Sequence, residues 1–68
     1  MTVSYRKLWK LLIDKRMKKT ELLKESDIST TTLSKLSKDQ IVSMEVMRRI
    51  CTALSCDIGD VMEMVPDD

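Results

Sequence analysis

The sequence has 68 residues, enough for one small domain with a thin core. Hydrophobic residues make up 43% of it, with one Trp, one Tyr and no Phe, so the core must rest on aliphatic side chains and Met. With no His, no Gly-rich phosphate loop and no cluster of metal ligands, we expect no enzyme, no metal site and no cofactor. No secretory leader and no apolar run of membrane-spanning length are present, which predicts a cytoplasmic protein that does not bind membranes.

The charges are distributed unevenly, although the net charge is only +1. Residues 1–38 hold ten Lys or Arg and four Asp or Glu, a balance of +6. Residues 39–68 hold two Arg and seven acidic residues, a balance of −5. This asymmetry predicts a basic face that turns toward a polyanion and an acidic side that turns away from it.

The first predicted helix spans residues 5 to 15 or 16, with Ser4 as its N-cap. Its apolar side chains cover an arc of about 160°, which is wider than the stripe of a surface helix. Either the helix is central to the core, or the margin of the arc that carries Trp9 and Ile13 contacts another molecule.

The second predicted helix spans residues 19–26 and lacks a good capping residue at Lys18. Its free N-terminal amides, together with Lys18 and Lys19, either receive a phosphate or form a frayed, solvated end. Asp27 then separates this helix from the next one. A tight turn between helices commonly needs a positive φ, which Asp tolerates better than most residues.

The third predicted helix spans residues 30–38, with Ser29 as its N-cap. Leu33 and Leu36 form a narrow buried stripe on it. The remaining surface carries only hydroxyl and lysine side chains, namely Thr30, Thr31, Ser34, Lys35, Ser37 and Lys38. Such a face suits contacts to phosphates and base edges in the major groove, or it is an ordinary solvated surface.

The rest of the chain predicts a loop over residues 39–42 and a helix over 44–55 that Ser43 caps. A final short helix is predicted over residues 58–64, which Pro66 ends. The cysteines at positions 51 and 56 would lie about 140° apart on a helix, so we expect buried thiols and no disulfide. The sequence therefore predicts five short helices and no strands, in an all-α domain.

Residues 17–65 resemble the Cro/C1-type helix-turn-helix domain of phage repressors and bacterial regulators. The segments that carry the resemblance are Met17–Leu23, Asp27–Ser29, Thr32–Leu36, Ile50–Cys56 and Asp60–Met62. The first helix and the closing residues 64–68 resemble a branch of very short stand-alone regulators. The resemblance implies one compact, five-helix, lambda-repressor-like domain over residues 1–68, with the motif at 19–38 and the recognition helix at 30–38.

In that family the second helix of the motif enters the major groove of double-stranded DNA. The resemblance therefore implies a sequence-specific transcriptional regulator. The implied base contacts are Thr30, Thr31, Ser34 and Lys35. The implied phosphate contacts are Lys19, Ser29 and Lys38, with Lys18 and Gln40 as weaker candidates.

The chain departs from the family pattern at several positions. Asp27 stands where the family usually has Gly, and Leu23 stands where a small Ala usually lets the two helices cross closely. The loop over residues 37–40 lacks the common Asn-Gly. The predicted reading face also lacks the Gln, Asn or Arg side chains that most often make bidentate base contacts. We therefore expect weak sequence specificity, or specificity that depends on DNA shape.

An alternative is a protein-interaction module on the same fold, such as an antitoxin-like or regulator-binding adaptor. Its partner would bind through Trp9, Ile13 or the C-terminal helix. This alternative leaves the basic half of the chain unexplained. The domain either acts as a monomer or forms a homodimer on a two-fold operator. Such a dimer would form through the last helix or through the margin of the first.

Overall fold

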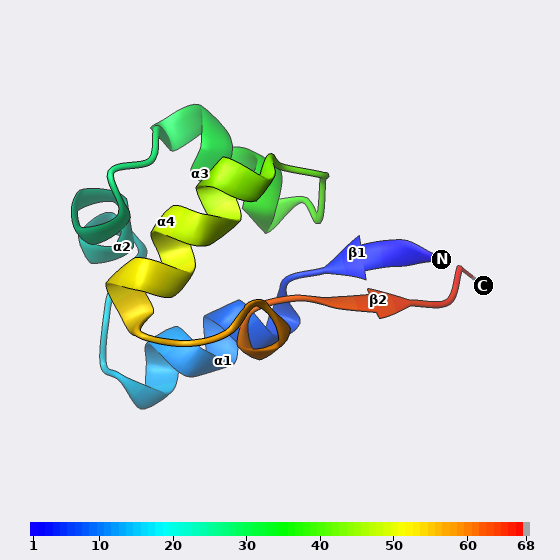
Figure 1. Ribbon diagram of the computed structural model, residues 1–68, viewed down its shortest axis with the longest axis horizontal. Helices are drawn as coiled ribbons and strands as arrows, with labels where there is room; N and C mark the ends of the chain where they lie inside the picture. Colours follow the sequence, from blue (N-terminus) through cyan, green and yellow to red (C-terminus); the bar gives the residue numbers. More distant parts are fainter. Residues whose placement is uncertain (68) are drawn as a thin grey trace.

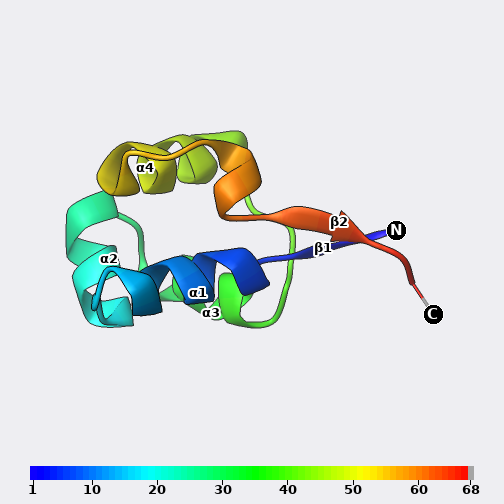
Figure 2. The same cartoon turned by 90° about the horizontal axis from the view of Figure 1, so that it is seen from below.

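The computed structural model describes residues 1–67, which form four α-helices, one short 3-10 helix and a two-stranded sheet (Figure 1). In chain order these are β1 (Thr2–Ser4), α1 (Arg6–Asp14), α2 (Lys19–Ser26), α3 (Thr30–Ser37), α4 (Met44–Leu54), η1 (Ile58–Asp60) and β2 (Glu63–Val65). Figure 2 shows α4 on one side of the molecule and α1 and α3 on the other, while both strands project from one end. No helix in the described part of the chain is long and apolar enough to cross a membrane.

The core lies between the helices and takes at least one fully buried side chain from each of the four α-helices. Leu8 and Leu12 are four residues apart on α1, so they lie on the same face and both point inward. Helix α4 packs against α2. The buried apolar residues are Val3, Tyr5, Leu8, Leu12, Leu22, Leu36, Met47, Ile50, Leu54 and Val61.

Each α-helix is followed within two residues by a residue in the left-handed conformation, and none of these residues is glycine. They are Arg16, Asp27, Asp39 and Ser55, with φ between 52° and 55°. The predicted positive φ at Asp27 is therefore confirmed. The next amide bonds back to a carbonyl five residues earlier in each case, at Met17–Leu12, Ile28–Leu23, Gln40–Lys35 and Cys56–Cys51. These are the hydrogen bonds of a Schellman motif, which satisfies carbonyls at the helix end.

The predicted helix starts are confirmed at α3 and α4 but are wrong at α1. The Ser29 hydroxyl accepts a hydrogen bond from Thr32 N–H, and Ser43 caps α4 in the same way. Tyr5, not Ser4, is the N-cap of α1. Ser4 belongs to β1, and its hydroxyl only accepts a 3.3 Å bond from the amide of Arg6.

The prediction of five helices and no strands is wrong at the ends of the chain. The helix predicted over residues 58–64 stops as the 3-10 helix η1, and β2 follows it as an antiparallel partner of β1. Val3 pairs with Met64 in this sheet and is buried. When β2 pairs with β1, its backbone amides and carbonyls gain hydrogen-bond partners. A short helix before Pro66 would leave some of these groups without a partner. The C-terminal helix proposed as a protein-binding surface is therefore not present.

Candidate nucleic-acid interface

Most hydroxyl and lysine side chains of helix α3 are exposed. Leu36 is fully buried and Leu33 is half-buried, so these two residues fix the orientation of the helix. The opposite side chains then face solvent because of the helical period. All four predicted base-contacting residues are exposed there, namely Thr30, Thr31, Ser34 and Lys35.

The turn that connects α2 to α3 is held from both sides. Asp27 ends α2, and the Ser29 hydroxyl accepts a 3.1 Å bond from Thr32 N–H at the start of α3. From α4, Arg49 Nη1 donates a 2.8 Å bond to the backbone carbonyl of Asp27. Arg49 thus ties the turn of the motif to α4. Sequence reasoning missed this role, since a contact between α4 and the turn carries no local signal.

The loop that follows α3 is anchored to the start of α1. The Tyr5 hydroxyl donates to the backbone carbonyl of Gln40 at 2.8 Å, and the Tyr5 amide donates to Asp39 Oδ1 at 3.1 Å. Burial raises the pKa of Tyr5, so its hydroxyl stays a donor at neutral pH. These bonds hold the backbone of Gln40 and leave its side chain exposed.

The start of α2 differs from its prediction. Lys18 makes no side-chain cap hydrogen bond, as predicted, but the Glu21 carboxylate accepts a 3.0 Å bond from the amide of Lys18, which the prediction did not include. Glu21 follows three residues after the N-cap, which is the spacing of a capping box. The ammonium of Lys19 lies 4.4 Å from the centre of the Trp9 ring, within the range of a cation–π contact.

The five predicted phosphate contacts are all exposed. They follow the edges of the motif, with Lys18 and Lys19 at the start of α2, Ser29 at the start of α3, and Lys38 and Gln40 after its end. Of the side chains assigned to a protein partner, Ile13 is 73% exposed while Trp9 is half-buried.

A carboxylate on α4 connects two arginines. Glu45 Oε2 lies 2.6 Å from Arg48 Nη2 and 3.0 Å from Arg49 Nε. Hydrogen bonds from both guanidinium groups lower the pKa of Glu45 to about 2. Glu45 is therefore ionised at neutral pH and orients Arg49, the residue that reaches the turn of the motif.

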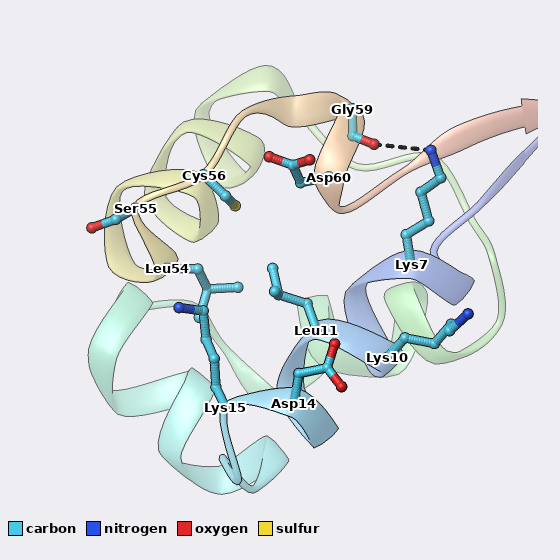
Figure 3. Close-up of a pocket in the computed structure, with 10 residues that line it drawn as sticks. All are labelled: Lys7, Lys10, Leu11, Asp14, Lys15, Leu54, Ser55, Cys56, Gly59 and Asp60. Atoms are coloured by element: carbon cyan, nitrogen blue, oxygen red, sulfur yellow. Dashed lines mark hydrogen bonds between the residues drawn. The ribbon is translucent and has the colours of Figure 1, made fainter.

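A cavity of about 510 Å³ opens between α1, the end of α4 and η1 (Figure 3). Lys7 Nζ donates a 3.2 Å hydrogen bond to the carbonyl of Gly59 at its rim. Its lining residues are Lys7, Lys10, Leu11, Asp14, Lys15, Leu54, Ser55, Cys56, Gly59 and Asp60. None of them belongs to α3, so this cavity lies apart from the candidate interface.

Two helices joined by a capped turn, with the second exposing a face of hydroxyl and lysine side chains, define a helix-turn-helix DNA-binding domain. The family model of the Cro/C1-type HTH DNA-binding domain matches residues 7–67, and the chain belongs to this family. It is also similar to a solved structure, the crystal structure of the transcriptional regulator VanUg in form II. The two chains are 50% identical, with a TM-score of 0.93 over 97% of this chain and 88% of that one. No curated protein gives a significant sequence match.

Proposed function

We propose that this DNA-binding domain acts as a sequence-specific transcriptional regulator that lays α3 in the major groove. The observation that carries the proposal is the exposed face of α3, which holds only hydroxyl and lysine side chains beside a turn fixed by Ser29 and Arg49. The similarity to a transcriptional regulator supports the same role.

The proposed contacts divide into two groups. Thr30, Thr31, Ser34 and Lys35 read base edges. Lys18, Lys19, Ser29, Lys38 and Gln40 hold phosphates on either side of the groove. Phosphate contacts set the orientation of the domain, while base contacts give sequence preference. Since most of the reading side chains are short, we expect DNA shape to contribute a large part of the specificity.

Two copies of the domain would bind two half-sites about one helical turn apart. A homodimer on a two-fold operator is therefore part of the proposal. Sedimentation measures how many copies of the protein associate. It is done with the protein alone and with a DNA duplex that the protein has been selected to bind. Binding of one copy per duplex would remove the dimer from the proposal and leave the role of α3 in place.

The function is tested by selecting bound fragments from random DNA, then measuring affinity for the selected duplex by fluorescence anisotropy over a series of salt concentrations. Lys38→Ala is expected to weaken binding to all sequences and to reduce the salt slope by about 1. Lys35→Ala is expected to cost about 1–3 kcal/mol and to relax the preference at one base position.

Lys10→Ala is the matched control, because Lys10 lines the cavity between α1 and η1, to which no residue of α3 contributes. It removes the same charge and should leave the base preference unchanged. Binding that is indifferent to salt and to both test substitutions would overturn the proposed function.

A further inference from the structure

The end of α4 brings the two cysteines together. Helix α4 stops at Leu54, Ser55 adopts φ 52°, and the amide of Cys56 bonds to the carbonyl of Cys51 at 3.0 Å. Together with the 3.4 Å bond from Ser55 N–H to the carbonyl of Thr52, this forms a Schellman motif. A contact between the side chains of the first and last residues often accompanies this motif, and here both are cysteines, which line one cavity and interact through their thiols. The predicted separation of the thiols is therefore wrong, because it assumed a continuous helix.

Both cysteines line one cavity of about 290 Å³ together with two methionines. Cys51 and Cys56 are half-buried, Met47 is buried and Met44 is 71% exposed. The cavity thus has four sulfur-bearing side chains in its wall and remains open to solvent on one side. Thiolate and thioether ligands select soft metal ions, Cu(I) above all among the monovalent ions.

The sequence alone predicts no metal site, since it has no His and no clustered ligands, but the turn after α4 brings the two cysteines to one cavity. We propose that this cavity binds one Cu(I) ion through the thiolates of Cys51 and Cys56, with the thioether of Met47 as a further ligand. Binding breaks two S–H bonds, forms two Cu–S bonds and releases two protons, and the oxidation state of the metal does not change. Asp57 and Arg48 both line the same cavity, so a carboxylate and a guanidinium lie near the proposed site and their charges offset each other. The site lies outside the proposed DNA contacts, and its test does not depend on DNA binding.

Two other uses of the thiols fit the structure less well. A structural zinc ion takes four Cys, His or acidic ligands, and among residues 1–67 no three such side chains gather around a metal position. A reversible disulfide requires a reactive thiolate. Burial raises the pKa of both thiols, that of Cys56 to about 11, so neither is a fast nucleophile at neutral pH. Cu(I) binding also needs both thiols deprotonated, but there the metal itself displaces the two protons.

The test is a titration of the reduced, full chain with Cu(I) under anaerobic conditions, in competition with a chromophoric Cu(I) chelator. We expect one copper ion per chain to be withdrawn from the chelator, with two protons released into a weakly buffered solution. Cys51→Ser and Cys56→Ser should each abolish this withdrawal. Met47→Leu keeps the side-chain volume and should weaken the retention of Cu(I) against the chelator. Met64→Leu on β2 is the control, and it should leave the retention of Cu(I) unchanged.

Helical circular dichroism establishes that each variant is folded. If a serine variant is unfolded, Cys51→Ala or Cys56→Ala takes its place, since alanine keeps the apolar character of the site. The proposal is overturned if the chain withdraws no copper, if a folded double cysteine variant still withdraws it, or if Zn(II) displaces the bound Cu(I) at equal concentration.

Discussion

The ammonium of Lys19 rests 4.4 Å from the centre of the Trp9 ring, beside the start of α2. A lysine held in this way has fewer rotamers to lose when a phosphate arrives, so less ordering entropy opposes the contact. The half-buried Trp9 therefore supports the proposed interface from α1. Its ring is partly covered by a side chain of the same chain, which makes it a poor site for a protein partner.

The Glu45 carboxylate should make stability depend on pH. Its pKa is lowered from 4.5 to about 2 in the folded chain by hydrogen bonds from Arg48 and Arg49. The stabilisation is therefore complete above pH 4.5 and is lost as the pH falls toward 2. We expect Glu45→Gln to lower Tm at pH 7 and to flatten the decline of Tm between pH 4.5 and 2. Circular dichroism melts at a series of pH values measure this.

Glu25→Gln serves as the control, since Glu25 is exposed on α2 and pairs with no cation among the described residues. It should leave the shape of the pH curve unchanged. Parallel curves for wild type and Glu45→Gln would show that the arginine contacts contribute nothing to stability.

At the scale of elements, the helix ends have an unusual composition. All four left-handed residues carry a Cβ, although glycine is the residue that adopts this conformation without cost. Asp27→Gly is expected to raise the free energy of unfolding by about 1 kcal/mol, because it removes the strain at φ 55°. Urea denaturation measures the change.

Lys24→Gly is the control, because it places glycine inside α2 instead of after it. It is expected to lower the free energy of unfolding by about 1 kcal/mol. If Asp27→Gly destabilises the chain, then contacts of the Asp27 side chain outweigh the strain. The 3.9 Å approach of its carboxylate to Arg49 is the candidate for such a contact.

The bond from Arg49 to the carbonyl of Asp27 should position α3 for DNA binding. Arg49→Met removes it and is expected to lower affinity for the selected duplex about fivefold, the loss of about 1 kcal/mol for a partly exposed hydrogen bond. Arg48→Met is the matched control, because Arg48 also pairs with Glu45 and carries the same charge but does not reach the turn. Anisotropy titrations at one salt concentration compare the two. Equal losses of affinity in the two variants would show that the removed positive charge, and not the bond to Asp27, accounts for the weaker DNA binding.

The helices of the motif could be predicted from local signals. Apolar spacing and the hydroxyl caps Ser29 and Ser43 are read within one turn of helix, and the bounds of α2 agree with the prediction. The strands could not be predicted in this way, because each has three residues and its partner lies at the other end of the sequence. The candidate nucleic-acid interface shows the same difference between local signals and long-range packing. Exposure of the α3 face follows from periodicity, while the supports from Arg49 and Tyr5 depend on packing between distant segments.

At the scale of the whole molecule, the acidic half of the chain supplies structural ion pairs. Glu63 on β2 accepts from Arg6 at 2.8 Å and lies 3.6 Å from Lys7. These pairs neutralise cations at the start of α1, while the lysines of α2 and α3 stay exposed. Residues 1–18 hold six Lys or Arg and one acidic residue, whereas residues 19–38 hold four Lys and three acidic residues. Within the motif, α3 carries Lys35 and no acidic side chain, so the positive charge that would face DNA belongs to α3 and to the residues before α2, and the motif as a whole has no large excess.

The pairing of β1 with β2 also has a consequence for the order of folding. Val3 lies opposite Met64, so this contact closes a loop that contains all four helices. Closing so long a loop costs entropy that only the packed helices can offset. We expect the sheet to form last and to open first. In native-state hydrogen exchange, the paired amides of the sheet should exchange faster than that of Ile50 in the core of α4, through an opening that leaves α3 folded.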